Sequence, residues 1–165
     1  MQGPVARDIC RELEELEADG AELQDLLRKA VESLHESSSN YDWTGIYELH
    51  GNGVLRLGPY VGEATEHVHI TVGQGVCGTA VANNCNMNVP DVSKATNYLA
   101  CSTRTKSELV ILIRREGTIY AQIDIDSHEL DAFSEEMAHE VEALADWLAL
   151  AYERHEAGVA LSTPR

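Results

Sequence analysis

Two apolar stretches joined by a Glu-Gly pair occupy residues 107–127, SELVILIRREGTIYAQIDIDS. Both stretches are rich in Ile, Val and Leu, which favour strands, and the Glu-Gly pair at 116–117 suits a tight turn between antiparallel strands. A second hairpin is predicted around the Gly-Asn-Gly turn at 51–53, because residues 43–49 alternate and an apolar run follows at 54–57. Since each hairpin pairs strands that are consecutive in the chain, we expect an antiparallel sheet.

Helices are predicted at both ends of the chain. Residues 4–37 repeat apolar side chains at steps of three and four, and Gly20 interrupts this stripe, so two helices are expected there. A last helix should begin near Ser134, a good N-cap residue. With a third strand at 68–72 and a short helix within 73–84, the predicted fold class is α+β, an antiparallel sheet of five to six strands covered by N- and C-terminal helices. The expected buried face of the last helix is Met137, Val141, Leu144, Leu148 and Tyr152.

The chain is predicted to comprise an N-terminal helical segment at 1–39 that packs on the domain, one domain at 40–156 and a flexible tail at 157–165. The narrow apolar stripe of the first segment fits either packing on the protein's own sheet or a seam with a second copy in a homodimer. Residues 85–106 carry no regular pattern, and so long a stretch inside a small domain indicates a functional loop.

The charge of the chain limits its partners. Its 165 residues include 28 Asp and Glu against 12 Lys and Arg, giving a net charge of -16. Such a chain repels phosphate backbones and anionic lipids, which argues against nucleic-acid and membrane partners. The absence of a long apolar run and of a signal sequence predicts a cytoplasmic protein. The acid excess fits either an ordinary acidic surface or adaptation to a salt-rich cytoplasm.

Three carboxyl groups are candidates for chemistry. Strand alternation places Asp124 and Asp126 on one face of their strand, while Ile123 and Ile125 point to the other face. Glu108 begins the neighbouring strand and can join them. Carboxylates at close range do not all ionise easily, so one pKa should rise and leave a proton donor for general acid catalysis.

Two of the four cysteines stand in suggestive places. Cys77 lies in GQGVCGTA at the start of a predicted helix, where the helix dipole favours the thiolate, and Cys101 lies in the irregular loop. Cys10 and Cys85 are interpreted as structural. The pair His67 and His69 has H-x-H spacing but no second ligand pair nearby, so neither a metal site nor a cofactor is predicted.

Several separate motifs resemble one family. From about residue 40 to 155 the chain is similar to a GAF domain, and more narrowly to the free methionine-(R)-sulfoxide reductases. Cys77 and Cys101 have the spacing of two redox cysteines of that family. The matching segments are DWTGIYEL (42–49), LRLGPYVG (55–62), VGQGVCGTAVA (72–82), DV (91–92), LAC (99–101), KSELVILI (106–113) and QIDIDS (122–127).

The resemblance implies an enzyme that reduces free L-methionine-(R)-sulfoxide and is recycled by thioredoxin. Cys101 would be the nucleophile, which becomes a sulfenic acid and then a disulfide. The carboxyl groups of Glu108, Asp124 and Asp126 would hold the substrate ammonium and the sulfoxide oxygen. The remaining pocket residues would be Trp43, Tyr47, Leu99 and Ala100.

The chain departs from the family at the residue ten positions before Cys77, where His67 replaces a common cysteine. The resolving thiol is therefore predicted to be Cys77, with Cys85 as the alternative. Two other functions remain open on the same fold, a non-catalytic GAF sensor of a small ligand and a thiol-based redox sensor.

Overall fold

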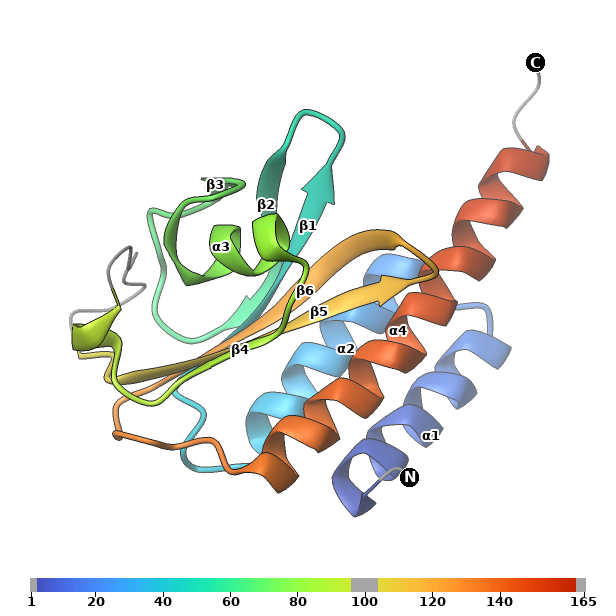
Figure 1. Cartoon of the computed structure of the whole chain (residues 1–165). Coiled ribbons are helices and arrows are strands. Elements are labelled where there is room, and N and C mark those ends of the chain that lie inside the picture. The colour runs from blue at the N-terminus through green and yellow to red at the C-terminus, as the bar shows by residue number, and fades with distance from the viewer. Residues whose placement is uncertain (1–2, 96–103, 163–165) are drawn as a thin grey trace.

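The computed structural model describes residues 3–95 and 104–162, with side chains described as far as residue 156. Six antiparallel strands form one sheet in the order β3-β2-β1-β6-β5-β4, with helices on both faces (Figure 1). The predicted α+β class is confirmed. The strands are β1 (Trp43–His50), β2 (Val54–Val61), β3 (His69–Thr71), β4 (Met87–Val89), β5 (Ser107–Arg115) and β6 (Thr118–Ser127). The helices are α1 (Pro4–Ala18), α2 (Leu23–Glu36), α3 (Gly75–Asn83), α4 (Glu135–Ser162) and the short 3-10 helix η1 (Val92–Lys94).

The sheet has two differently covered faces. On one face α2 packs on β1 and β2 and α4 packs on β5 and β6, while α1 lies outside them against α2 and α4. The other face carries α3, which contacts β3, β5 and β6. Because side chains alternate along a strand, each strand contributes to both cores. Ile123 and Ile125 lie in the core under α2 and α4, as the alternation predicts.

Both predicted hairpins are present. The β5–β6 turn places Glu116 at φ 49° and Gly117 at φ 83°, and positive φ at two central residues is what a tight turn between right-twisted strands requires. At the β1–β2 turn, Gly53 has φ 74°. The N-cap of α4 is also as predicted, because the Met137 amide donates to Ser134 Oγ at 3.2 Å.

The apolar stripe of residues 4–37 is buried within the chain. Ile9 and Leu13 of α1 and Leu27 of α2 share one core with α4, and the predicted break at Gly20 separates the two helices, with φ 97° at this residue. Of the two readings of the stripe, the structure therefore supports packing on the protein's own domain.

Two sequence expectations differ from the structure. The stretch expected to be irregular, 85–106, contains β4, which pairs with β5 at an edge of the sheet. Three residues are too short for an alternation to be visible in a sequence. The predicted flexible tail at 157–165 begins within α4, which continues to Ser162.

Within residues 3–95 and 104–162, no helix combines the length and the apolar character that a bilayer crossing requires.

Gly78 in α3 provides a test of the close approach between α3 and β3. A methyl group added at Gly78 would lie 2.6 Å from the Thr71 carbonyl oxygen and 2.9 Å from the Gly73 nitrogen, both backbone atoms. Gly78→Ala should therefore lower the unfolding free energy by about 1–3 kcal/mol, although alanine normally stabilises a helix. Urea denaturation measures the change. Gly51→Ala is the control, since nothing lies within 4 Å of the added methyl group, and equal effects at the two positions would contradict the packing argument.

Candidate active site

The sheet face beneath α3 carries all three candidate carboxyl groups. Residues directly opposite each other in antiparallel strands point to the same face. Asp126 is paired with Glu108 on one side and with Trp43 on the other, and Asp124 is paired with Gly45 one step further along the sheet. The prediction that the two aspartates share a face, and that Glu108 joins them, is confirmed.

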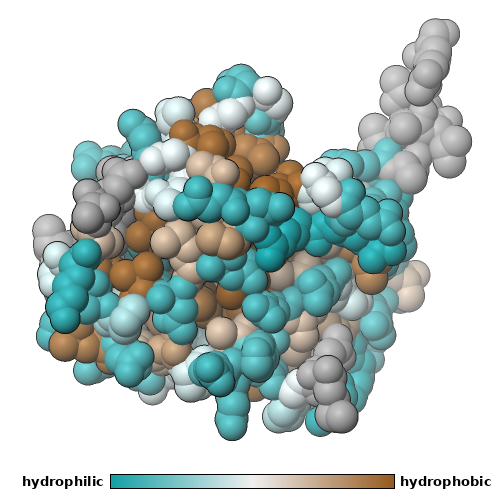
Figure 2. All heavy atoms as spheres, viewed as in Figure 1, coloured by the Kyte–Doolittle hydropathy of each residue, from teal (hydrophilic) through white to brown (hydrophobic). Residues whose placement is uncertain are grey.

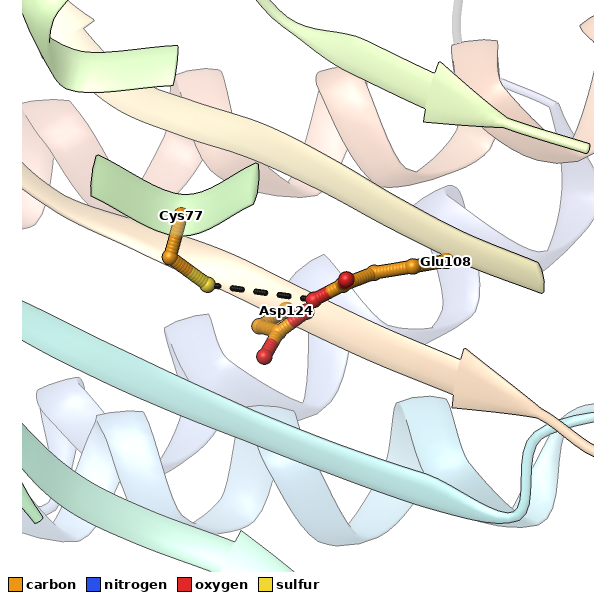
Figure 3. Close-up of side chains that lie close together, drawn as sticks. All are labelled: Cys77, Glu108 and Asp124. Carbon is orange, nitrogen blue, oxygen red and sulfur yellow. Dashed lines mark hydrogen bonds between the residues drawn. The ribbon is translucent and has the colours of Figure 1, made fainter. Parts of the chain in front are cut away.

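These carboxyl groups are deeply buried. Glu108 is 2% exposed, and Asp124 and Asp126 are each 1% exposed. Cys77 is the third residue of α3, and its side chain points toward Glu108 and Asp124 (Figure 3). Its Sγ donates a hydrogen bond to Glu108 Oε2 at 3.9 Å, and Sγ and one oxygen from each of Glu108 and Asp124 lie within 4.8 Å of one another.

The raised pKa of Asp124 suits a proton donor. Burial raises its pKa, and hydrogen bonds with Glu108 and Cys77 offset part of the rise. Neither Asp124 oxygen accepts a hydrogen bond from an N–H or hydroxyl group of the described chain, so a bond between the two carboxyl groups requires a proton on one of them. The sequence predicted a raised pKa from mutual repulsion, whereas the largest cause is loss of hydration.

Gln122 is a site residue that the sequence reasoning missed. It is completely buried on the same face of β6, two residues before Asp124, and its Nε2 donates to the Cys77 carbonyl oxygen at 3.0 Å. A glutamine on the apolar-strand face that also carries the aspartates was the available signal. Gln122 thus ties the first part of α3 to the centre of the sheet.

Trp43 and Tyr47 form an aromatic wall beside the carboxyl groups. Their rings stack with centroids 6.2 Å apart, and the Trp43 ring also stacks on Tyr60. The Trp43 indole donates to the Glu63 carbonyl oxygen at 3.0 Å, and the Tyr47 hydroxyl donates to the His67 carbonyl oxygen at 2.8 Å. The wall therefore holds the connection between β2 and β3 in place.

His67 lies in the connection before β3, which begins at His69. From there it borders a small cavity of about 10 Å³, much smaller than the few hundred Å³ of a usual ligand pocket. The described residues around this cavity are His67, Ile70, Gln74, Gly75, Val76, Cys77, Glu108 and Asp124.

A larger groove of about 710 Å³ runs between α3, β4 and the turn at 130–131. Hydrophobic side chains reach the surface around α3 and β4, among hydrophilic ones (Figure 2). Gly75 and Val76 border both the groove and the small cavity, so the first turn of α3 separates the two spaces.

Comparison with known proteins shows which family this fold belongs to. The GAF domain profile matches residues 22–152 and so includes α2, which the predicted division assigned to the N-terminal segment. Free methionine-R-sulfoxide reductase of Escherichia coli is 33% identical over 129 residues, which are 78% of this chain and 77% of that protein. This chain belongs to the free methionine-R-sulfoxide reductase family of GAF-domain enzymes. The resemblance stated from the sequence motifs is thereby confirmed.

Solved structures agree with this family assignment. The type II free methionine-R-sulfoxide reductase of Thermoplasma acidophilum is 38% identical, with a TM-score of 0.74 over 81% of this chain and 97% of that chain. The free methionine-R-sulfoxide reductase of Neisseria meningitidis, solved in complex with its substrate, is 28% identical, with a TM-score of 0.84 over 93% of this chain and 92% of that chain. GAF domain-containing protein A of Dictyostelium discoideum is 38% identical over 96 residues, 58% of this chain, and the match spans 60% of that protein's length.

Part of the predicted reductase site lies outside the described residues, namely Leu99, Ala100 and Cys101. The described chain resumes at Arg104, which forms an ion pair with Glu63, the residue whose carbonyl oxygen accepts the Trp43 indole hydrogen bond. Arg104 thus contacts the same connection between β2 and β3 that Trp43 holds. Cys85 is exposed and Cys10 is buried in the core beneath α1, α2 and α4.

Asp124→Asn should remove a pH-dependent loss of stability. Because folding raises the pKa of Asp124 above its reference value of 3.8, its proton stabilises the fold fully below that value, and this contribution is lost as the pH rises through the raised pKa. The variant cannot titrate. Its stability relative to the wild type should therefore grow by up to about 1.4 kcal/mol per pH unit across that window.

Urea denaturation of both proteins at several pH values measures this difference. Asp19→Asn, at an exposed position, controls for the loss of one negative charge. A stability difference between Asp124→Asn and the wild type that does not change with pH would contradict the raised pKa.

Proposed function

We propose that this chain reduces free L-methionine-(R)-sulfoxide to methionine, with Cys101 as the nucleophile and Cys77 as the resolving thiol. The observation that carries the proposal is the buried cluster of Cys77, Glu108 and Asp124, with ligand atoms within 4.8 Å of one another, in a chain of this reductase family. A sensor of a phosphorylated ligand would need cations at this position, and the site offers carboxyl groups instead.

The site's composition suits a free amino acid. An ammonium group supplies the positive charge that buried carboxyl groups require, and Glu108, Asp124 and Asp126 are the groups that would receive it. The stacked rings of Trp43 and Tyr47 offer an apolar surface for the methyl group and side chain of the substrate. The small cavity must enlarge to admit the substrate, and the first turn of α3 lies between it and the larger groove.

In the first step the Cys101 thiolate attacks the sulfoxide sulfur, and a protonated carboxyl group gives its proton to the sulfoxide oxygen. The oxygen passes to Cys101 as a sulfenic acid, and methionine leaves with its sulfur reduced. Asp124 is the favoured donor, because burial raises its pKa and keeps it protonated to higher pH. The carboxyl group regains its proton from solvent.

In the second step the Cys77 sulfur attacks the Cys101 sulfenic acid, forming a disulfide and releasing water. The Cys77 thiol must lose its proton as it attacks, and its hydrogen bond places Glu108 to receive that proton, which then passes to the leaving hydroxyl group to give water. A dithiol protein of the thioredoxin type then reduces the disulfide and returns both cysteines to thiols. A cytoplasmic location would supply such a reductant.

Recognition of the ammonium group predicts a strong preference for the free amino acid. N-acetylmethionine sulfoxide carries no charge at its nitrogen and leaves the carboxyl cluster without a cation, a loss of about 1–3 kcal/mol or about 5- to 150-fold in kcat/KM. Turnover of the free and N-acetylated sulfoxides with the same reductant measures the ratio. Glu108→Gln should narrow it, and equal rates on both substrates in the wild type would refute the role of these acids.

The cysteine assignment predicts distinct phenotypes. Cys101→Ser should abolish the formation of methionine from racemic free methionine sulfoxide, whereas the wild type should consume half of the racemate. Cys77→Ser should release one methionine per chain and then stall, unless the reductant attacks the sulfenic acid directly. Cys10→Ser and Cys85→Ser should keep most of the activity.

Peptide mapping by mass spectrometry after one equivalent of substrate identifies the disulfide directly. The expected product is a Cys77–Cys101 link. A dominant Cys85–Cys101 link with Cys77 still reduced would assign the resolving role to Cys85. Failure of the wild type to form any methionine would favour the sensor alternatives.

A further inference from the structure

We propose that Cys77, Glu108 and Asp124 also form a binding site for a zinc ion. The three residues come from α3, β5 and β6, and one ligand atom from each lies within 4.8 Å of the other two. Because the three residues are widely spaced in the sequence, no short metal-binding motif reveals them, which explains why the sequence predicted no metal site.

The spacing of these atoms is close to that of a zinc ligand set. Zinc bonds of about 2.3 Å to sulfur and about 2.0–2.2 Å to oxygen place tetrahedral ligand atoms about 3.3–3.7 Å apart. The observed distance from Cys77 Sγ to Glu108 Oε2 is 3.9 Å. Side-chain movements of about 1 Å would complete the geometry, and a water molecule can take the fourth position, as in open zinc sites.

Asp124 points to a ligand independently of this proximity. It is 1% exposed, it borders the cavity of about 10 Å³, and neither of its oxygens accepts a hydrogen bond from an N–H or hydroxyl group of the described chain. A cavity of that size has room for about one water molecule or one ion. None of the described residues around it is a lysine or an arginine, so the described lining supplies no permanent cation to pair with an ionised Asp124, whereas a bound metal ion would.

The ligand types select the metal. Magnesium and calcium take oxygen ligands, while zinc combines a cysteine thiolate with nitrogen or oxygen ligands. Binding zinc requires Cys77 to lose its proton, so affinity should fall toward acid pH.

A bound zinc ion would stop the proposed reductase reaction. It would hold the Cys77 sulfur as a ligand and occupy the carboxyl groups proposed to receive the substrate ammonium. This consequence rests on the proposed function, whereas zinc binding itself does not.

The experiment measures metal binding by the reduced, metal-free full chain. Competition with a chromophoric chelator should give one tight zinc ion per chain, and cobalt should give a thiolate-to-metal charge-transfer band. Cys77→Ser should weaken zinc binding at least tenfold and abolish the cobalt band. Asp124→Asn should weaken zinc binding at least tenfold as well.

Cys85→Ser is the matched control, because Cys85 is exposed and belongs to no cluster in the described chain that could hold a metal; it should bind zinc as the wild type does. Circular dichroism verifies that each variant is folded, and Glu108→Gln replaces any variant that is not. Absence of a tight zinc ion, retention of it in folded Cys77→Ser, or its loss in Cys85→Ser would overturn the proposal. These readouts involve no turnover, so loss of the reductase assay alone bears only on the proposed function.

Discussion

The burial of carboxyl groups on an otherwise apolar sheet face is the constraint on which the site depends. Glu108, Asp124 and Asp126 are almost inaccessible to water, and each would prefer to be hydrated or paired with a cation. The fold supplies a cover, α3, in place of water. Because burying an ionised carboxyl group is costly, a proton, an ammonium group or a metal ion bound at this cluster would stabilise it.

The two faces of the sheet have different roles. The core beneath α1, α2 and α4 is built from hydrophobic residues such as Ile111, Ile123 and Ile125 along the centre of the sheet, and it anchors β5 and β6. The carboxyl groups on the opposite face of the same strands can then be held at fixed positions, because rigid strands rather than loops determine their separation. Alternate residues of β6 thus contribute either to the hydrophobic core or to the carboxyl cluster.

Much of this arrangement follows from the sequence. The alternation in QIDIDS places the aspartates opposite the isoleucines, the turn at 116–117 brings Glu108 beside Asp126, and the steps of three and four in residues 4–37 predict two packed helices. The sequence does not reveal β4, whose three residues are too few to show a period. It also cannot show that Gln122 supports Cys77, or that burial rather than repulsion raises the pKa of Asp124, because both depend on how α3 lies across the sheet.

The position of Cys77 on α3 has a mechanical consequence. The first turn of α3, which includes Gly75 and Val76, separates the groove from the cavity, and Cys77 belongs to the same turn. Any displacement of this turn that widens the passage for a bulky molecule also carries the sulfur with it, stretching the Gln122 hydrogen bond to the Cys77 carbonyl oxygen. The same movement of α3 therefore opens the small cavity and moves the Cys77 sulfur away from the carboxyl groups.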